Sequence, residues 1–221
     1  MSAPAKITKE KIINAVLSCA FDKSVGATSL ADIAKKLGIK KASLYNHYEN
    51  RDAMIADTVR WCGEYLSKLI FIPNNLPAIC KKYSATGVMK ALISRWLKLN
   101  ESEQVIQIYS FLESEKYFSN EAAKIVENHR TKFIKQTAIA LATLASAKKI
   151  IIENPRKISL LSEILALFVR EYLDYHIVQK KLIIRSNPET GSDSLFQNMT
   201  LPEPSTAKLD KLIAEYCALL K

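Results

Sequence analysis

The sequence predicts an all-α fold, in which an N-terminal three-helix helix-turn-helix unit precedes a larger helical bundle. Apolar residues recur at intervals of three and four along most of the 221 residues, and no segment from residue 78 onward shows the alternation of a half-buried strand. The five glycines are too widely spaced to form a phosphate-binding glycine-rich loop or a dinucleotide fingerprint. Nucleotide-binding α/β folds are therefore disfavoured.

The first two predicted helices carry clear start and stop signals. The first lies between Thr8 and Gly26, where apolar residues repeat at helical spacing. The second begins after Ser29, because Ser29 and Asp32 have the S-x-x-D spacing of a capping box. It ends at Gly38, which can adopt the left-handed conformation that terminates a helix and turns the chain.

A third short helix is predicted over residues 40–48, with Ile39, Leu44 and Tyr48 directed inward. It is too short to be stable alone, so packing must hold it in place. A short helix, a glycine turn and a second short helix with exposed polar side chains are typical of a helix-turn-helix DNA-binding unit. Asn50 then supplies the N-cap of a fourth helix, which we expect to reach residue 72, just before Pro73.

The remainder of the chain is predicted to be helical as well. The expected helices cover residues 78–83, 86–99, 103–117, 120–149, 156–182 and 206–220. The start of the helix at 156 is well marked, since Asn154 can cap it and Pro155 suits the first helical position. A loop rich in Ser, Asn, Pro and Gly is predicted over residues 185–205.

Composition and charge restrict the class of protein. The chain is 48% hydrophobic and has a net charge of +10, and half of that excess, +5, lies in residues 1–51. The N-terminal unit is therefore the part suited to contact a polyanion. A membrane-spanning helix needs about 20 apolar residues, and all apolar runs in the chain are shorter. Residues 1–11 lack the apolar core of a secretory signal. We expect a cytoplasmic protein with no membrane partner.

Sites for metals, disulfides or catalysis are not predicted. Cys19, Cys62, Cys80 and Cys217 are scattered without a CxxC pair, so we expect buried free thiols and no metal site. The sequence has no HExxH, GxSxG or Walker motif, and its three histidines are far apart. We expect no cofactor, no catalytic residues and no enzymatic activity, although a helical enzyme with a site assembled across the bundle stays a remote alternative.

The predicted third helix and the residue after its turn carry side chains that suit DNA contacts. Asn and Ser side chains can hydrogen-bond base edges in the major groove, while Tyr hydroxyls and lysines can bind phosphate oxygens. The exposed face of the third helix would present Lys41, Ser43, Tyr45, Asn46 and His47. Arg51 opposes the macrodipole in the first turn of the next helix, and a phosphate bound at that N-terminus would reverse the sign of this effect.

Three segments resemble the DNA-binding domain of the TetR family of transcriptional regulators. They are residues 28–39 (TSLADIAKKLGI), 42–48 (ASLYNHY) and 50–52 (NRD), and the resemblance extends over about residues 8–60. It implies DNA-contact positions at Ser29, Lys40, Lys41, Ser43, Tyr45, Asn46, His47 and Arg51, with Arg51 replacing the usual phosphate-binding lysine. Two residues depart from the family pattern: Ala31 replaces a long polar side chain, and Lys40 replaces the Ser or Thr that commonly caps the recognition helix.

The resemblance also implies a homodimer, a near-palindromic double-stranded DNA operator and a small-molecule effector. Accordingly, residues 1–50 are the predicted helix-turn-helix domain and residues 51–221 the predicted ligand-binding and dimerisation domain. Candidate ligand-binding residues are amphipathic or polar side chains within apolar helices: Trp96, Tyr109, Glu113, His129, Phe133, Tyr172 and His176. Candidate dimer contacts on the last two helices are Leu161, Ile164, Leu165, Phe168, Tyr172, Leu209, Leu212, Ile213 and Tyr216.

We therefore expect a ligand-responsive transcriptional regulator, more a repressor than an activator, that binds its operator as a dimer. The alternative is a protein of the TetR fold that acts through protein–protein interaction without specific DNA binding. Ala31 and Lys40 favour that alternative, because both lie on the expected DNA face.

Overall fold

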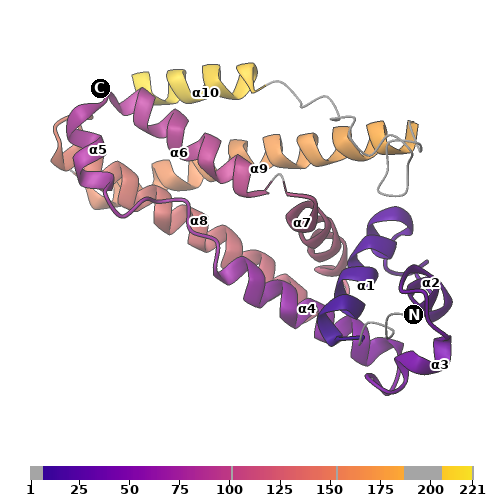
Figure 1. Ribbon diagram of the computed structural model, residues 1–221. Coiled ribbons are helices and arrows are strands. Elements are labelled where there is room, and N and C mark those ends of the chain that lie inside the picture. The colour runs from indigo at the N-terminus through magenta and orange to yellow at the C-terminus, as the bar shows by residue number, and fades with distance from the viewer. Residues whose placement is uncertain (1–6, 101, 153, 187–205, 221) are drawn as a thin grey trace, which may run out of the picture. The chain divides into compact units, whose positions relative to one another are not determined.

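The structure, a computed structural model, describes residues 7–100, 102–152, 154–186 and 206–220 (Figure 1). All regular elements in these ranges are helices, which confirms the all-α prediction. From residue 187 onward, the loop expected over residues 185–205 lies outside the described residues. The chain divides into two compact units, the first of residues 1–69 and 99–130, the second of residues 70–98 and 131–221. No helix among the described residues is long and apolar enough to cross a bilayer.

The first unit contains helices from two separate parts of the sequence. They are α1 (Lys9–Lys23), α2 (Leu30–Lys36), α3 (Lys41–Leu44), α4 (Arg51–Ser67), α7 (Glu103–Glu115) and the first turns of α8 (Asn120–Ser146). Helix α1 packs against α2, α4 and α7, and α2 packs against α3. Residues of α7, among them Val105, Ile108 and Leu112, share one hydrophobic core with Ile12 and Leu17 of α1. As a packing unit, the N-terminal helices therefore extend beyond the predicted boundary at residue 50.

In this unit the predicted start of α2, its stop at Gly38 and the predicted start of α4 are confirmed. The Ser29 hydroxyl accepts a hydrogen bond from the backbone N–H of Asp32 at 3.2 Å, and the Asp32 carboxylate accepts one from the N–H of Ser29 at 3.0 Å, which completes the capping box. Gly38 adopts a positive φ of 66°. The Asn50 side chain accepts from the N–H of Ala53 at 2.8 Å and so caps α4. Each of these features depends on residues within one helical turn.

Helix α3 is shorter than predicted. Regular helix covers Lys41–Leu44, and residues 45–47 form a turn. The N-cap residue Lys40 makes no capping hydrogen bond with its side chain. The buried side chains of Leu44 and Tyr48 hold the segment instead, as the inward positions predicted.

Helix α4 also ends before the predicted residue 72. It stops at Ser67, and Ile70 beyond it is 57% exposed. Phe71 is buried and packs on Phe133 with 5.3 Å between ring centroids, while its backbone N–H donates to Oε1 of Gln136 at 2.9 Å. A side-chain acceptor on α8 thus replaces the helical hydrogen bond of Phe71, a replacement that local periodicity does not reveal.

The second unit is built from the longer helices. It contains α5 (Leu76–Lys82), α6 (Ala85–Asn100) as far as residue 98, the remainder of α8, α9 (Pro155–Ser186) and α10 (Ala207–Ala218). Helices α9 and α10 pack together, and the Tyr216 hydroxyl of α10 donates to the carbonyl of Leu161 at 2.9 Å. The predicted start of α9 is confirmed, because Pro155 is its first residue and Oδ1 of Asn154 accepts from the N–H of Arg156 at 2.9 Å.

The four cysteines are free thiols and all are buried, as predicted. Burial raises the pKa of the Cys62 thiol to about 12 and also raises the pKa of Cys19 and Cys80. Raised thiol pKa values oppose formation of the nucleophilic thiolate. Among the described residues, no group of His, Cys, Asp or Glu side chains could hold a metal ion.

Candidate nucleic-acid interface

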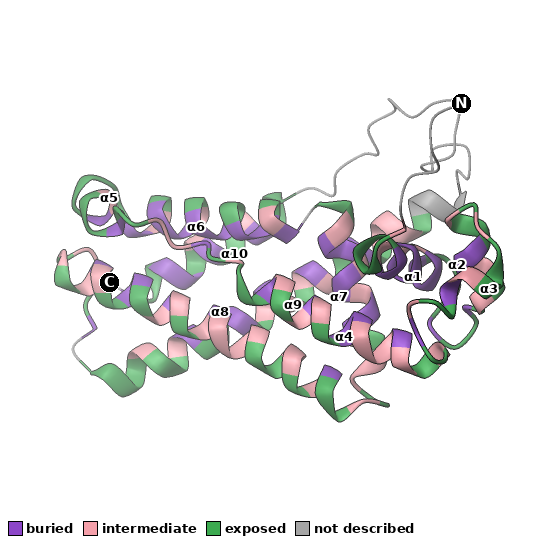
Figure 2. Ribbon diagram, turned by 60° about the horizontal axis from the view of Figure 1, so that its bottom comes forward, coloured by how far each residue is buried: buried purple, intermediate pink, exposed green. Residues whose placement is uncertain are grey.

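The best candidate for a DNA-contact surface is the recognition segment, which we define as residues 40–47. Lys40, Lys41, Tyr45 and Asn46 are exposed, and Ser43 and His47 are half-buried. In Figure 2 the ribbon around α3 accordingly shows the colours of exposed and half-buried residues. Tyr45 exposes 51% of its surface. The segment therefore presents hydrogen-bonding and cationic groups on one side and packs its apolar residues on the other.

A tight turn positions the recognition segment against α2. Gly38, with its positive φ, donates its N–H to the carbonyl of Lys35 at 3.1 Å, and the N–H of Ile39 donates to the carbonyl of Ala34 at 3.0 Å. The side chain of Ile33 on α2 is fully buried. Two short helices joined by a glycine turn and seated on a shared core form the helix-turn-helix arrangement.

A hydrogen-bond network fixes the end of the recognition segment to α4. The Tyr48 hydroxyl donates to Oδ2 of Asp57 at 2.8 Å, and Arg60 pairs with Oδ1 of the same carboxylate at 2.9 Å. The Lys9 ammonium lies 5.4 Å from the Tyr48 ring centroid. The sequence predicted that Tyr48 points inward but did not identify Asp57 as its partner. The need of a buried tyrosine hydroxyl for a hydrogen-bond partner could have indicated that such a residue exists.

The ionisation states of this network follow from its surroundings. Burial acts to raise the pKa of Asp57, but the hydrogen bonds from Tyr48 and Arg60 outweigh it and leave the pKa below its ordinary value. Burial and the nearby Asp57 carboxylate raise the pKa of the Tyr48 phenol. At neutral pH the phenol is therefore protonated and donates to an ionised carboxylate, which is a charge-assisted hydrogen bond.

Ser29 is exposed, but its hydroxyl already serves the capping box. The hydroxyl accepts from the N–H of Asp32 and donates to Oδ2 of the same residue at 2.8 Å. Oδ1 of Asp32 forms an ion pair with Lys23 of α1 at 2.6 Å. The hydrogen bonds from Lys23 and Ser29 hold the pKa of Asp32 well below its usual range. A DNA contact by Ser29 stays a prediction.

Arg51 also has partners within the protein. Its Nε donates to the carbonyl of Thr28 at 3.0 Å, and its Nη2 donates to the carbonyl of Val25. These backbone carbonyls, from the turn between α1 and α2, offset the unfavourable position of a cation in the first turn of α4. The phosphate contact predicted for Arg51 stays a prediction.

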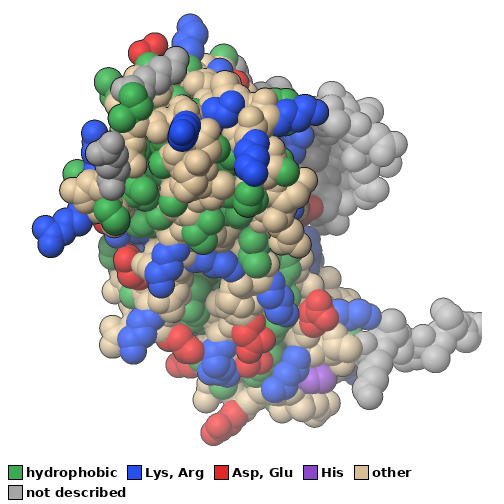
Figure 3. Space-filling view, turned by 90° about the vertical axis from the view of Figure 1, so that its left-hand side faces the viewer, with side chains coloured by type: hydrophobic (Ala, Val, Ile, Leu, Met, Phe, Trp, Pro, Cys, Tyr) green, Lys and Arg blue, Asp and Glu red, His purple; other side chains and the backbone are tan. Residues whose placement is uncertain are grey.

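Figure 3 shows one face of the molecule, on which Lys and Arg side chains lie among acidic and hydrophobic ones. The recognition segment combines amide, hydroxyl, imidazole and ammonium groups, which are the groups that contact bases and phosphates.

The structure brings together only some of the candidate ligand-binding residues. In the second unit, Trp96 and Phe133 are buried, with 4.9 Å between their ring centroids, and Phe71 packs on the same Phe133 ring. Thr137, one turn along α8 from Phe133, has a buried hydroxyl with no hydrogen-bond partner among the described residues. Sequence reasoning missed both Phe71 and Thr137, because neither stands out from the apolar pattern.

The other candidates lie elsewhere. Tyr172 and His176 are neighbours on α9, with 6.2 Å between their ring centroids. Tyr109, Glu113 and His129 belong to the first unit, where Glu113 forms an ion pair with Lys116 at 2.6 Å. The seven candidates are therefore distributed over both units.

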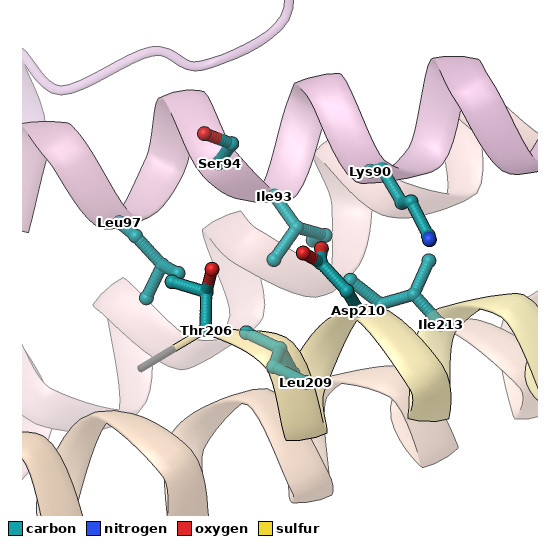
Figure 4. Close-up of a pocket in the computed structure, with 8 residues that line it drawn as sticks. All are labelled: Lys90, Ile93, Ser94, Leu97, Thr206, Leu209, Asp210 and Ile213. Carbon is teal, nitrogen blue, oxygen red and sulfur yellow. The ribbon is translucent and has the colours of Figure 1, made fainter. Parts of the chain in front are cut away.

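A small cavity lies between α6 and α10 (Figure 4). It is lined by Lys90, Ile93, Ser94, Leu97, Thr206, Leu209, Asp210 and Ile213. Its volume of about 70 Å³ is equivalent to roughly two water molecules in the liquid, so it is too small for an organic effector. None of the candidate ligand-binding residues lines it.

The candidate dimer contacts divide into buried and exposed residues. Leu165, Leu209, Ile213 and Tyr216 are buried within the chain itself, where α10 covers one apolar stripe of α9. The ring of Phe168 packs on that of Tyr216 at 5.9 Å between centroids. These residues pack within the protomer, and their dimer contacts stay a prediction. Of the nine candidates, Ile164 and Leu212 are exposed.

A second apolar stripe of α9 is exposed, and the predicted dimer contacts include only one of its members. This α9 seam consists of Leu160, Ile164, Leu167, Tyr175, Val178 and Leu182, each at least 42% exposed. Most successive members are three or four residues apart, which places them along one side of the helix. The helical spacing of both stripes was visible in the sequence, but not which stripe α10 covers.

Comparisons with known proteins agree with this geometry. The family of bacterial regulatory proteins named tetR matches residues 12–58. The chain is 37% identical over 67 residues to IcaR of Staphylococcus aureus, a negative transcriptional regulator of the biofilm operon icaADBC. This match covers 30% of the chain and 36% of IcaR. It is also 33% identical over 106 residues to IcaR of Staphylococcus epidermidis. This match covers 48% of the chain and 54% of that IcaR. The matches thus span about a third to a half of these relatives.

Solved structures show the same fold over nearly the whole chain. A TetR transcription regulator from Haloarcula marismortui superposes with a TM-score of 0.61 at 9% identity and covers 96% of this chain and 97% of its own. A TetR-like transcriptional regulator from Rhodococcus sp. RHA1 superposes with a TM-score of 0.59 at 13% identity and covers 98% and 97%. All of these similar proteins are named as transcriptional regulators. Residues 12–58 thus match the DNA-binding domain of the TetR family, and the fold of the chain is that of TetR-family regulators, which together support a TetR-family transcriptional regulator.

Proposed function

We propose that this chain is a homodimeric repressor that binds a near-palindromic DNA operator through its recognition segment and is released by a small molecule. The observation that carries the proposal is the recognition segment itself, which exposes Tyr45, Asn46 and two lysines while Leu44 and Tyr48 fix it to a rigid core. The repressor role is supported by the similarity to IcaR, which is a negative transcriptional regulator.

The side chains of the recognition segment divide between two kinds of DNA contact. Tyr45 and the lysines at 40 and 41 carry groups that bind phosphate oxygens and orient the protein on the duplex. Asn46 carries an amide that can form two hydrogen bonds with an adenine edge in the major groove. Affinity would therefore depend mainly on Tyr45 and the lysines, and base preference mainly on Asn46.

The α9 seam is the proposed dimer interface, together with the exposed Leu212 of α10. A stripe of large apolar side chains on a 32-residue helix is costly in water and favours burial against a second copy. A two-fold dimer presents two recognition segments to successive major grooves about 34 Å apart, which explains the expectation of a near-palindromic operator.

The proposed effector site is the aromatic cluster of Phe71, Trp96 and Phe133 beside the Thr137 hydroxyl. Ligand sites are mostly apolar with a few polar groups, and this cluster has that composition. The rings contact one another directly, so a ligand that entered would have to separate them. An apolar effector with one hydrogen-bonding group fits this chemistry.

The proposal is tested by selecting DNA from a random library with the purified dimer and measuring fluorescence anisotropy on the selected sequence. We expect a complex that resists unlabelled competitor DNA at physiological salt and weakens steeply as salt is raised. The Tyr45→Ala variant is the matched control, because it removes an exposed side chain without affecting the core. Failure to select any sequence would overturn the proposal and favour a role in protein–protein interaction.

A further inference from the structure

The Arg51 side chain connects the start of α4 to the turn that precedes α2. Arg51 is the first residue of α4, and its guanidinium donates to the carbonyls of Thr28 and Val25 in the turn that precedes α2. The same turn has internal hydrogen bonds, from the N–H of Thr28 to the carbonyl of Val25 at 3.1 Å and from the Thr28 hydroxyl to the carbonyl of Ser24 at 2.7 Å. Val25 and Thr28 are both buried. We call residues 24–28 the α1–α2 turn.

The α1–α2 turn determines where α2 begins. It leads directly into Ser29, the N-cap of α2, and α2 packs on α3 at the start of the recognition segment. The turn begins at Ser24 with a φ of 92°, a conformation that is unfavourable for a residue other than glycine and therefore needs support from its surroundings. Two hydrogen bonds from Arg51 supply that support from α4.

The remaining nitrogen of Arg51 lies near a carboxylate that is itself 95% exposed. Nη1 lies 3.9 Å from Oδ1 of Asp52. Burial raises the pKa of the half-buried Glu115 carboxyl on α7, and the charge of Arg51 partly counters this rise. A phosphate would have to compete with these partners for a group whose side chain is only 32% exposed.

We infer that Arg51 is a positioning residue, which fixes the α1–α2 turn and through it the recognition segment, and that it does not bind DNA phosphate. This inference rests on the proposed function. A lysine is a poor substitute, because its three donors share one nitrogen on a flexible chain, whereas Arg51 donates to the two carbonyls from two nitrogens of a rigid, planar fork. The substitution Arg51→Lys therefore separates the geometric role from the role of positive charge.

The experiment compares Arg51→Lys and Arg51→Met with the unsubstituted protein by DNA anisotropy at several salt concentrations. We expect both variants to bind the selected operator about tenfold or more weakly. We also expect the slope of log affinity against log salt and the binding to non-specific DNA to stay unchanged. The matched control is Lys41→Met, which removes an exposed cation and should lower the magnitude of the slope by about one for each phosphate that is no longer neutralised.

The opposite pattern would overturn the inference. If Arg51→Lys kept full affinity while Arg51→Met showed weaker binding together with a shallower salt slope, Arg51 would be a phosphate ligand. Circular dichroism of each variant checks that its helices are intact.

Amide hydrogen exchange tests the same inference without DNA. The N–H of Thr28 should exchange faster in both Arg51 variants and at the normal rate in Lys41→Met. Equal exchange in all proteins would show that Arg51 does not hold the turn and would also overturn the inference. If the unsubstituted protein selects no operator, the proposed function fails first, and the positioning role in DNA binding fails with it.

Discussion

The Tyr48 hydroxyl donates a 2.8 Å hydrogen bond to Oδ2 of Asp57, nine residues later on α4. The bond joins the residue that follows the recognition segment to the helix that continues from it. Because Arg60 binds the other oxygen of the same carboxylate, Asp57 is held from both sides. The recognition segment, which has only one turn of regular helix, thus takes its rigidity from contacts outside itself.

Removing this hydrogen bond should destabilise the first unit. For Tyr48→Phe we expect the free energy of unfolding to fall by about 1–2 kcal/mol, since a charge-assisted hydrogen bond is removed and the Asp57 oxygen is left without its phenol donor. Urea unfolding followed by circular dichroism measures the change. Tyr45→Phe is the control, because Tyr45 is exposed and should tolerate the change within about 0.5 kcal/mol. Equal destabilisation of the two variants would contradict the importance of the Tyr48–Asp57 bond.

Two substitutions in the recognition segment should have different effects on DNA binding. Tyr45→Ala should weaken binding to all sequences about equally, because it removes a phosphate-binding group. Asn46→Ala should instead relax base preference at one position of each half-site by about 1–3 kcal/mol, because it removes a base-reading group. Anisotropy on the selected operator and on single-base variants distinguishes the two. The reverse pattern would exchange the assigned roles.

Gly38 should tolerate a side chain poorly, although there is room for one. A Cβ at Gly38 would meet nothing within 4 Å, so the cost of Gly38→Ala comes from its φ of 66°. We expect the free energy of unfolding to fall by about 1 kcal/mol. Gly26→Ala is a matched control, since its Cβ would also meet nothing within 4 Å and its φ lies outside the strained positive range. A Gly38 variant as stable as the Gly26 variant would show that the turn does not require glycine.

The pH dependence of stability should include a contribution from Asp32. Its pKa is lower in the folded chain than in the unfolded chain, because Lys23 and Ser29 donate hydrogen bonds to the carboxylate. Asp32 therefore stabilises the fold above pH about 4, and this contribution disappears as the pH falls below that value. Urea unfolding between pH 7 and pH 3 should show a smaller acid-induced destabilisation in Asp32→Asn. Asp52→Asn, whose carboxylate is 95% exposed, should behave as the unsubstituted protein.

The α9 seam can be tested by introducing a charge. Leu167 is 60% exposed, so Leu167→Glu should leave the protomer folded while it dissociates the dimer, because an unpaired carboxylate would be buried in the interface. Sedimentation velocity at micromolar concentration measures the oligomeric state. Ile151→Glu, at an exposed position outside α9, is the control and should stay dimeric. A dimeric Leu167→Glu protein would place the interface elsewhere.

Structural features that depend on residues close together in the sequence were predicted, and those that depend on residues far apart in the sequence were not. The capping box of Ser29 and Asp32, the stop at Gly38 and the cap at Asn50 were all predicted, because each involves residues within one helical turn. The end of α4 was not, because the Phe71 N–H finds its acceptor 65 residues away, in the side chain of Gln136.

The candidate DNA surface shows the same division. The polar and apolar sides of the recognition segment follow from the sequence order of Leu44, Tyr45, Asn46 and Tyr48 alone. The partners of Arg51 lie 23 and 26 residues earlier, so the sequence marked this residue as unusual without revealing that backbone carbonyls surround it.

By itself, the sequence determined the helical class, most helix boundaries, the helix-turn-helix and its exposed side chains, because these depend on local periodicity and on capping by near neighbours. Only the tertiary structure decided that α7 completes the core of the N-terminal helices and that α10 covers one stripe of α9 while the α9 seam stays exposed. The physical reason is that a buried stripe and an interface stripe have the same composition and spacing, so only packing distinguishes them.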